Sequence, residues 1–372
     1  MDVVIDELLH GKETLLLRNP VLKLDRESLI DACARLGASG SVLVSTSGTS
    51  SSHRWVILTR DSLRGSARAV NARLDISEDD TWVCALPLFH VGGLAIYMRA
   101  EDSGSRVVTM EGQWDPNALV DCCNKNRATL TSLVPTQLFD LLKSGRSAPS
   151  GLRAVIIGGA PLTPRLRDAA LKKGWPVIAS YGMTEAGSQI ATQRHEGDGM
   201  NLLECWDARV GNDSTLEIRG TNLFNGYLVK HSGNWELVKP FDAEGWFRTG
   251  DRIELSGRAL NVLGRTDSVI KVLGEKVDVD CLQARVESIA GKHVAVIALT
   301  EERAGHQLVL LAEEGVDTVA VLDVYNDLSS GPERISNAYR VNEIPRGALG
   351  KLRRNEVQKL MDSHGKDSPQ LI

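Results

Sequence analysis

The chain has 372 residues, of which 42% are hydrophobic and 24% charged, and its formal net charge is −5 at pH 7 with a pI near 6.0. A chain of this length buries a full core, and we expect one large domain followed by a smaller one. Because positive and negative residues are interspersed, the composition argues against a surface for nucleic acid or anionic membranes and leaves small molecules as the expected partners.

Apolar runs that end at turn or glycine signals predict buried strands in the first half of the chain. The runs are VLVS at 42–45, WVCALPL at 82–88, AVIIGG at 154–159 and PVIAS at 176–180. Short continuous runs of this kind are typical of strands covered on both faces.

Helical patterns with readable caps lie between these runs. Asp25 precedes ESLIDACARL and Gly37 follows it, while Pro116 and Pro164, each after a capping residue, begin PNALVDCCNKN and PRLRDAALKKG. Strand, loop and helix alternate, so we predict a large layered α/β domain over 1–264, with its site on loops at strand ends.

The pattern changes after residue 264. HVAVIAL at 293–299, QLVLLAE at 307–313 and the basic KLRRNEVQKL at 351–360 predict a small α+β domain over 265–372. The segment GRTDSVIKVLGEK, at 264–276, lies at the join between the two predicted domains.

The cysteines and the N-terminus bear on the compartment. The six cysteines show no C-x-x-C spacing, which argues against a zinc site and a disulfide framework. The segment MDVVIDELLH is acidic, and no apolar run approaches the roughly 18 residues that a membrane span needs. We therefore expect a cytoplasmic protein with no membrane insertion.

The stretch STSGTSSSHRW, at 45–55, places hydroxyl groups and backbone N–H groups around Gly48, directly after a predicted strand. Such an arrangement can form an anion-binding concavity for phosphate. The G-x-x-x-x-G-K-[ST] spacing is absent, so a solvated Ser/Thr turn remains the alternative.

A second candidate segment is YGMTEAGSQ, at 181–189. Tyr181 could stack on a base, Thr184 could donate to a phosphate, and Glu185 could hold a magnesium ion. The alternative is a strand-to-helix turn with a capping threonine and a surface glutamate.

Two further segments carry single charged candidates. In GWFRTGD, at 245–251, Asp251 could accept hydrogen bonds from the hydroxyls of a ribose, although an aspartate that only satisfies its own turn is the alternative. In PRGALGKLRR, at 345–354, Lys351 could neutralise developing negative charge, although an isolated lysine is usually only solvated.

Taken in this order, the four segments resemble the signature motifs of the adenylate-forming superfamily, which includes acyl- and aryl-CoA synthetases, luciferases and peptide-synthetase adenylation domains. Further matches are LPLFHVGG at 86–93, GGAPLTP at 158–164 and GRTDSVIKVLGEK, and the resemblance covers roughly residues 40–354. YGMTEAGSQIAT, at 181–192, is most similar to the o-succinylbenzoate:CoA ligases of menaquinone biosynthesis. Phe89 is followed by His90, where amino-acid-activating relatives carry an aspartate, which favours an acid without an amine.

The resemblance implies a two-step ligase that uses ATP, Mg²⁺ and coenzyme A. A carboxylate would attack the α-phosphate of ATP to give an acyl-adenylate and pyrophosphate, and the thiol of coenzyme A would then displace AMP. Lys351 is implied to be the adenylation lysine, with His90, Thr184 and the magnesium-binding Glu185 as further catalytic positions. Asp267 is implied to be the hinge about which the small domain rotates between the two steps.

The resemblance also assigns binding roles. The positions implied to hold ATP or coenzyme A are Ser47, Gly48, Thr49, Ser50, Arg54, Gly159, Ala160, Pro161, Tyr181, Gly182, Asp251, Arg265 and Gly274. The positions implied to contact the acid are His90, Gly92, Gly93, Ser188 and Gln189.

The sequence departs from the superfamily pattern in its phosphate loop. That loop usually reads T-S-G-T-T-G-x-P-K-G, whereas here Ser51 replaces the second glycine, His53 the proline, Arg54 the lysine and Trp55 the last glycine. Loss of glycines removes access to positive φ, so the loop is expected to follow a different path or to be more rigid.

Two other departures concern coenzyme A and assembly. Val272 and Leu273 stand where relatives carry a further glycine or serine before Gly274. Only 44 residues precede the phosphate loop, so the N-terminal subdomain is expected to be shortened and its apolar surface covered in a homodimer.

Two other functions remain open from the sequence. One is a CoA ligase for another aryl or medium-chain acid, because the acid pocket is built from scattered side chains. The other is a catalytically degenerate homologue that binds nucleotide or acyl-adenylate and acts as a regulator.

Overall fold

The computed structural model describes residues 2–18, 25–46, 54–301, 304–329, 331–348 and 350–364. The helices are α1 Asp2–His10, α2 Arg26–Arg35, α3 Arg60–Leu74, α4 Val91–Ser103, α5 Pro116–Asn126, α6 Pro135–Lys143, α7 Pro164–Lys172, α8 Val279–Ala290, α9 Thr318–Asp327 and α10 Arg354–His364.

The strands of the described residues form four sheets. They are β1 Leu15–Leu17, β2 Val42–Thr46, β3 Arg54–Leu58, β4 Thr81–Cys84, β5 Arg106–Thr109, β6 Leu130–Leu133, β7 Ala154–Ile157, β8 Val177–Met183, β9 Ser188–Thr192, β10 Asn201–Leu202, β11 Asp207–Val210, β12 Thr215–Arg219, β13 Tyr227–His231, β14 Asn234–Val238, β15 Phe247–Ser256, β16 Ala259–Arg265, β17 Val269–Val272, β18 Glu275–Asp278, β19 Val294–Glu301, β20 Gly305–Ala312 and β21 Asn337–Arg340.

The largest sheet has a parallel half and an antiparallel half. Its order is β11-β12-β15-β16-β10-β9-β8-β7-β6-β4-β5, and the strands from β8 to β5 run parallel to one another. β8 is the boundary, since it pairs in parallel with β7 and antiparallel with β9. The polar segment at 181–189 therefore lies where the sheet changes direction.

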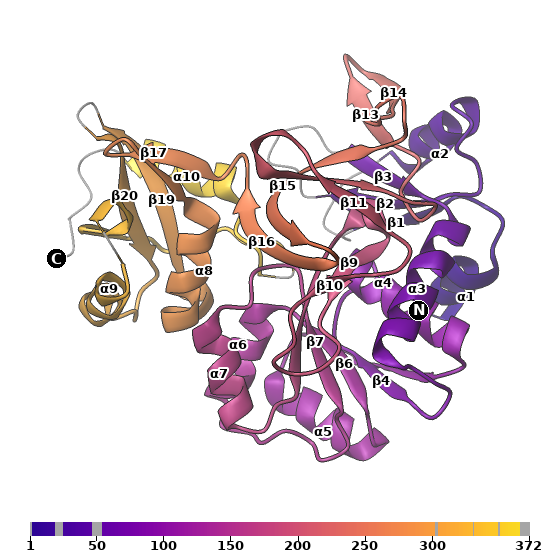
Figure 1. The fold of residues 1–372 in the computed structure, drawn as a ribbon, viewed down its shortest axis with the longest axis horizontal. Coiled ribbons are helices and arrows are strands. Elements are labelled where there is room, and N and C mark those ends of the chain that lie inside the picture. Colours follow the sequence, from indigo (N-terminus) through magenta and orange to yellow (C-terminus); the bar gives the residue numbers. More distant parts are fainter. Residues whose placement is uncertain are drawn as a thin grey trace.

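Helices cover both faces of the parallel strands (Figure 1). Ile156 of β7 packs in one cluster with α3 and α4, whereas its neighbours Val155 and Ile157 pack with α5, α6 and α7. This alternation follows from the period of two along a strand, and it makes a three-layer α/β/α arrangement. The predicted layered α/β class is confirmed.

A smaller sheet, β1-β2-β3-β13-β14, stands beside the first. Trp55 of β3 is fully buried, with Leu29 of α2 and Leu228 of β13 in the same cluster. The opposite face of this sheet, including Val44 and Val56, belongs to the main core.

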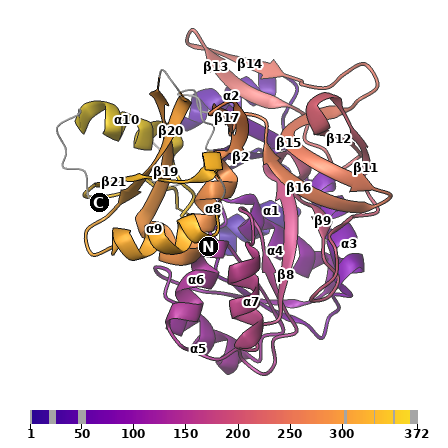
Figure 2. The ribbon, with the colours of Figure 1, turned by 60° about the vertical axis from the view of Figure 1, so that its left-hand side comes forward.

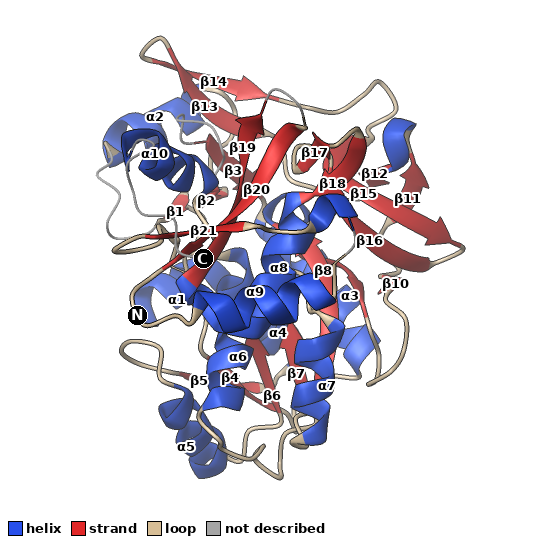
Figure 3. Cartoon of the chain, turned by 90° about the vertical axis from the view of Figure 1, so that its left-hand side faces the viewer, coloured by secondary structure: helices blue, strands red, loops and turns tan. Residues whose placement is uncertain are grey.

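The elements after Arg265 form sheets and clusters of their own. The order β19-β20-β21 makes a three-stranded sheet (Figures 2 and 3). Val286 of α8 and Tyr325 of α9 pack on one face of it, and Val357 of α10 packs on the other. The boundary near residue 264 stays a prediction.

Most predicted elements are present, and the caps act as expected. The side chains of Asp25, Asp115 and Thr163 each accept a hydrogen bond from the first turn of the helix that follows. The predicted strand at 82–88 is wrong beyond residue 84. Pro87 has no N–H to continue a ladder, and its carbonyl instead accepts a hydrogen bond from the backbone N–H of His90 at 3.0 Å.

Candidate active site

A hydrogen-bonded chain of side chains joins three strands. The Tyr181 hydroxyl donates to Asp251 Oδ2 at 2.5 Å, and Arg265 Nη1 donates to Asp251 Oδ1 at 3.1 Å. Arg265 also holds Asp267 through Nε and Nη2, at 2.8 and 3.0 Å. The pairing of β15 with β16 explains the arrangement, since the register places Asp251 opposite Arg265.

Lys351 lies within electrostatic range of this chain. Hydrogen bonds from Arg265 lower the pKa of the Asp267 carboxyl, and the positive charge of Lys351 contributes in the same direction. Burial raises the pKa of Tyr181 well above its usual value, with the negative charge of Asp251 as a further cause. Tyr181 is therefore neutral and acts as a hydrogen-bond donor. Arg265 pairs with Asp251 and Asp267, Lys351 adds positive charge near Asp267, and both cations are exposed.

A second polar cluster surrounds Glu185, which lies in the short 3₁₀ helix η1, Thr184–Ala186. Glu185 is buried, and its Oε1 accepts a hydrogen bond from the Tyr227 hydroxyl at 2.7 Å. The Arg54 guanidinium lies over the Tyr227 ring, 4.4 Å from the ring centre. Arg54, at the start of β3, is thereby linked to Glu185.

The backbone around η1 explains the shape of this segment. Gly182 has no room for a side chain, since a Cβ there would lie 1.9 Å from the Ser188 carbonyl oxygen. A register shift follows Tyr181 in the pairing of β8 with β9. Gly187, at φ +66°, ends η1. Thr184 begins η1 and is half-buried.

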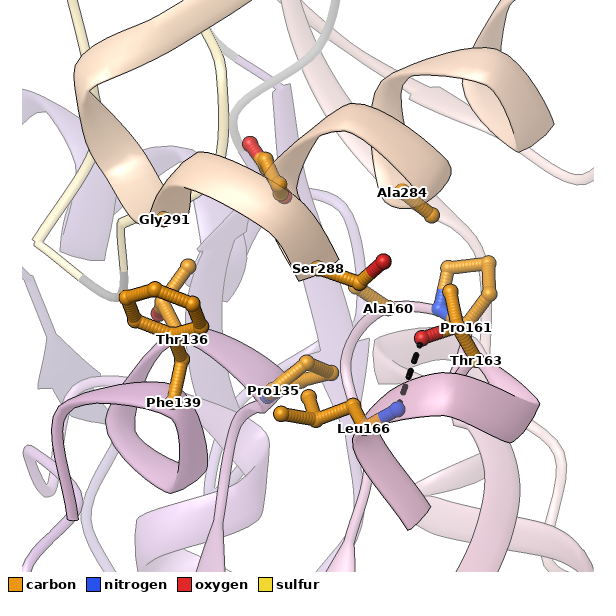
Figure 4. Close-up of a pocket in the computed structure, with 11 residues that line it drawn as sticks. Pro135, Thr136, Phe139, Ala160, Pro161, Thr163, Leu166, Ala284, Ser288 and Gly291 are labelled. Carbon is orange, nitrogen blue, oxygen red and sulfur yellow. Dashed lines mark hydrogen bonds between the residues drawn. The ribbon is translucent and has the colours of Figure 1, made fainter. Parts of the chain in front are cut away.

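A small pocket lies between α6 and α7 on one side and α8 on the other (Figure 4). Ala160 and Pro161 line it, after β7 and the left-handed turn at Gly159, φ +82°. Ala284 and Ser288 of α8 line the opposite side. Ala160 and Pro161, which the resemblance assigns to ATP or coenzyme A binding, therefore lie next to the C-terminal elements.

His90 is the N-cap of α4, and its carbonyl accepts hydrogen bonds from Gly93 and Leu94. Gly93 allows a close approach, because a Cβ there would lie 2.2 Å from the Pro87 carbonyl oxygen. A Cβ on Gly92 would lie 3.2 Å from Leu86 Cδ1. His90 Nε2 is buried and has no hydrogen-bond partner among the described residues.

Burial lowers the pKa of His90 from 6.5 to about 4, so the folded protein keeps a neutral ring where the unfolded chain already binds a proton. Its contribution to stability is thus complete above pH 6.5 and is lost as the pH falls towards 4. Over that window we expect the free energy of unfolding to fall by up to about 1.4 kcal/mol per pH unit more than in His90→Gln. Denaturation curves of both proteins at pH 7.5, 5.5 and 4.5 measure this, and parallel pH profiles would contradict it.

Ser188 and Gln189 begin β9 and are buried. Ser188 Oγ accepts a hydrogen bond from Arg99 Nη2 at 2.7 Å, and Gln189 Oε1 accepts one from Thr192 at 2.5 Å. Arg99 of α4 was missed at the sequence level. It is 2% exposed, its Nε has no hydrogen-bond partner among the described residues, and burial lowers its pKa to about 10.

Other predicted positions lie apart or outside the described residues. Gly274, at φ +84°, and Leu273, at φ +52°, form the exposed turn between β17 and β18. The left-handed region costs a non-glycine residue about 1 kcal/mol, so Leu273 strains this turn. The predicted phosphate-holding residues Ser47, Gly48, Thr49 and Ser50 lie outside the described residues, as do Ser51 and His53.

The sequence profile of the AMP-binding enzymes matches residues 38–228, just over half of the chain. The chain belongs to the AMP-binding enzyme family. The prediction of an adenylate-forming family is thereby confirmed. Of the residues described above, Tyr181 and Glu185 lie within the matched segment, whereas Asp251, Arg265 and Lys351 lie beyond it.

Relatives of this AMP-binding enzyme include two bacterial proteins named 2-succinylbenzoate–CoA ligase. The one from Bacillus cytotoxicus is 28% identical over 87% of this chain and 71% of the relative. The one from Listeria monocytogenes is 29% identical over 87% and 70%.

Solved structures share the fold. The o-succinylbenzoate CoA synthetase MenE from Bacillus subtilis, in complex with the acyl-adenylate intermediate OSB-AMP, matches 99% of this chain and 81% of its own with a TM-score of 0.74 at 24% identity. ATP-bound MatB from Rhodopseudomonas palustris matches 86% and 67% with a TM-score of 0.72 at 23% identity. At these identities the likeness establishes the fold alone.

Among the described residues, no helix is long and apolar enough to span a membrane.

Proposed function

We propose that this AMP-binding enzyme joins a carboxylic acid to coenzyme A with ATP, and that the acid is o-succinylbenzoate. A carboxylate oxygen attacks the α-phosphorus, a new O–P bond forms, and the bond to the bridging oxygen breaks to release pyrophosphate. The sulfur of coenzyme A then attacks the acyl carbon, AMP leaves, and the thiol proton passes to solvent.

The observation that carries the adenylation step is the chain of Tyr181, Asp251, Arg265 and Asp267, with Lys351 within electrostatic range of Asp267. Displacement at a phosphate depends on positioning and charge neutralisation. Arg265 is fixed by two carboxylates, whereas Lys351 has no hydrogen bond or ion pair of its side chain within the described chain. Lys351 is therefore the cation available to the carboxylate and α-phosphate oxygens.

The nucleotide roles follow from the same placement. Asp251 accepts one bond on each oxygen and retains lone pairs for ribose hydroxyls, with Arg265 beside it. Tyr181 and 159–161 border the adenine, and Thr184 with Arg54 contacts phosphate.

A magnesium ion fits the chemistry of Glu185. Mg²⁺ is usually held by one or two carboxylates together with substrate phosphates, and Glu185 offers a buried carboxylate whose Oε1 takes one hydroxyl hydrogen bond. Such an ion would neutralise phosphate charge during the first step.

The choice of acid is supported by the relatives' names and by Arg99. Among the described residues the buried Arg99 guanidinium contacts the Ser188 hydroxyl and the Trp82 ring but has no carboxylate partner, so an anion beside it would be stabilising. The acid o-succinylbenzoate has two carboxylates, one to be activated and one to pair with Arg99. Ser188 already lies against Arg99, with Gln189 next to it. His90 and Gly92–Gly93, from the same helix region as Arg99, would border the acid.

We also propose that 265–372 is a small lid domain, with Asp267 as its hinge, and that it rotates between the half-reactions to replace Lys351 by the Gly274 turn.

We further propose that the protein lies in the cytoplasm and assembles as a homodimer. The six cysteines are free thiols, which suits a reducing compartment. Sedimentation at micromolar concentration tests the dimer.

The experiment that tests the function measures pyrophosphate and thioester separately, with ATP, Mg²⁺, coenzyme A and one of three acids: o-succinylbenzoate, benzoate or octanoate. We expect both products, formed fastest with o-succinylbenzoate. Faster turnover of benzoate or octanoate would assign another aryl or medium-chain acid. Nucleotide binding without product from any acid would identify a degenerate homologue.

Arg99→Met should lower kcat/KM for o-succinylbenzoate by about 10- to 100-fold, because a charge-assisted hydrogen bond contributes about 1.5–3 kcal/mol. The turnover of benzoate should change little, since benzoate lacks the second carboxylate. A buried arginine replaced by an apolar side chain need not destabilise the fold, so the variant remains measurable. Equal losses for both acids would contradict the assignment of Arg99.

A further inference from the structure

Lys351 lies on a tight turn that fixes where its side chain begins. Arg346 and Leu352 form an isolated bridge, the Gly347 N–H donates to the Lys351 carbonyl at 2.8 Å, and the Gly350 N–H donates to the Gly347 carbonyl at 2.8 Å. Gly350 is in the left-handed region, at φ +74°. Since the Lys351 side chain is exposed, the path of this turn decides which volume its ammonium group samples.

Arg346 ties the turn to two other elements. Its side chain is 9% exposed; Nη1 donates to the Gly350 carbonyl at 2.6 Å and to Glu287 Oε1 at 2.7 Å, and Nη2 donates to the Val294 carbonyl at 2.8 Å. One guanidinium therefore joins the residue before Lys351 to α8 and to the start of β19. The rigid planar fork of arginine suits this role because two nitrogens at fixed positions reach the three acceptors, whereas a lysine presents all its donors from a single nitrogen.

Glu287 is itself held in place. Its side chain is 17% exposed, and Oε1 also accepts a hydrogen bond from Gln283 Nε2 at 2.8 Å. Gln283 donates to the Val294 carbonyl and accepts from the Val296 N–H at 2.6 Å, so it fastens α8 to β19. The pair of Arg346 and Glu287 thus rests on the body of the C-terminal part.

The other side of the turn faces α6. A Cβ on Gly350 would lie 2.9 Å from Thr136 Oγ1, and a Cβ on Gly291, at the end of α8, would lie 2.6 Å from Phe139 Cε1. Thr136 and Phe139 both point from α6 towards the end of α8 (Figure 4). Gly350 is therefore in contact both with the Arg346 guanidinium, through its carbonyl, and with α6, through its approach to Thr136.

We propose that Arg346, held by Glu287, is a positioning residue that sets the turn of Lys351 for adenylation. This inference rests on the function proposed above. Without the guanidinium, the turn loses its link to α8 and β19, and Lys351 samples a larger volume. Misplacement of a catalytic group by about 1 Å can lower a rate by about 100-fold. The thioester step should be spared, since Lys351 acts only in the first step.

The test compares Arg346→Met, Arg346→Lys and Glu287→Gln with the matched control Arg353→Met, which removes a surface ion pair with Glu356 two residues beyond Lys351. Pyrophosphate release is measured at varied ATP, and thioester formation is measured separately from supplied acyl-adenylate. Hydrogen exchange of the Gly347 and Gly350 amides reports on the turn, and thermal midpoints report on the fold.

We expect Arg346→Met to lower kcat for pyrophosphate release by about 10- to 100-fold with little change in KM for ATP, and to speed exchange at both glycines. Arg346→Lys and Glu287→Gln should lose less, and Arg353→Met should resemble the wild type. Thioester formation from supplied acyl-adenylate should persist in all four.

Equal losses in both half-reactions, in step with the thermal midpoint, would show a merely structural role and overturn the proposal. Unchanged pyrophosphate release in Arg346→Met would do so as well. If the wild type releases no pyrophosphate with any acid, the proposed function fails and the inference falls with it. Wild-type turnover with unaffected Arg346 variants overturns the inference alone.

Discussion

Lys351→Ala should slow pyrophosphate release by about 10²- to 10³-fold, the loss typical of one preorganised group that stabilises transition-state charge. The physical reason is the balance of positive and negative side chains around Asp251 and Asp267. Arg265 is already engaged by Asp251 and Asp267, so no second free cation stands ready in that chain of contacts. The measurement is single-turnover pyrophosphate release at saturating ATP and acid.

The matched control is Lys359→Ala, an exposed lysine on α10. It should leave both half-reactions unchanged, and Lys351→Ala should still form thioester from supplied acyl-adenylate. A variant that loses both half-reactions, or neither, would contradict the role proposed for Lys351. Loss of the first half-reaction in the control would instead indicate a general charge effect of the tail.

The sequence predicted the elements whose signals are local. A capping residue and a glycine or proline boundary are read within a few positions, and Asp25, Asp115 and Thr163 cap helices where expected. The end of β4 was not predicted, because an apolar run continues through Leu86 and Pro87 although the hydrogen-bond ladder does not. Hydrophobicity indicates burial and leaves the backbone path open.

The residues of the candidate site also divide into those that a local sequence motif predicts and those that it does not. The carboxylates, the tyrosine and Lys351 occur inside short motifs, and Asp251 does contact Tyr181 and Arg265. The side chains that hold these groups come from distant segments, so no local pattern shows them. Arg99 is 89 residues from Ser188, and Tyr227 is 42 residues from Glu185. A charged residue inside the apolar pattern LAIYMRA was the one available signal for Arg99.

Trp55→Ala should lower the free energy of unfolding by about 3–5 kcal/mol, the usual cost of truncating a fully buried aromatic side chain. Trp55 is 0% exposed and packs with Leu29 of α2 and Leu228 of β13. Its indole Nε1 has no partner among the described residues, so Trp55→Phe removes an unsatisfied donor and should cost only about 1–2 kcal/mol. Chemical denaturation followed by circular dichroism measures both.

The control is Trp235→Ala on the same sheet. Trp235 is half-buried and donates to Ser28 Oγ at 3.0 Å, so its loss should cost less than that of Trp55. Superfamily loops carry a glycine where this chain has Trp55, yet Trp55 lies within β3, paired with Ser45 and Leu228. Tryptophan therefore serves packing at this position. If Trp55→Ala keeps full stability but loses ATP binding, residue 55 belongs functionally to the phosphate loop, and the packing explanation is wrong.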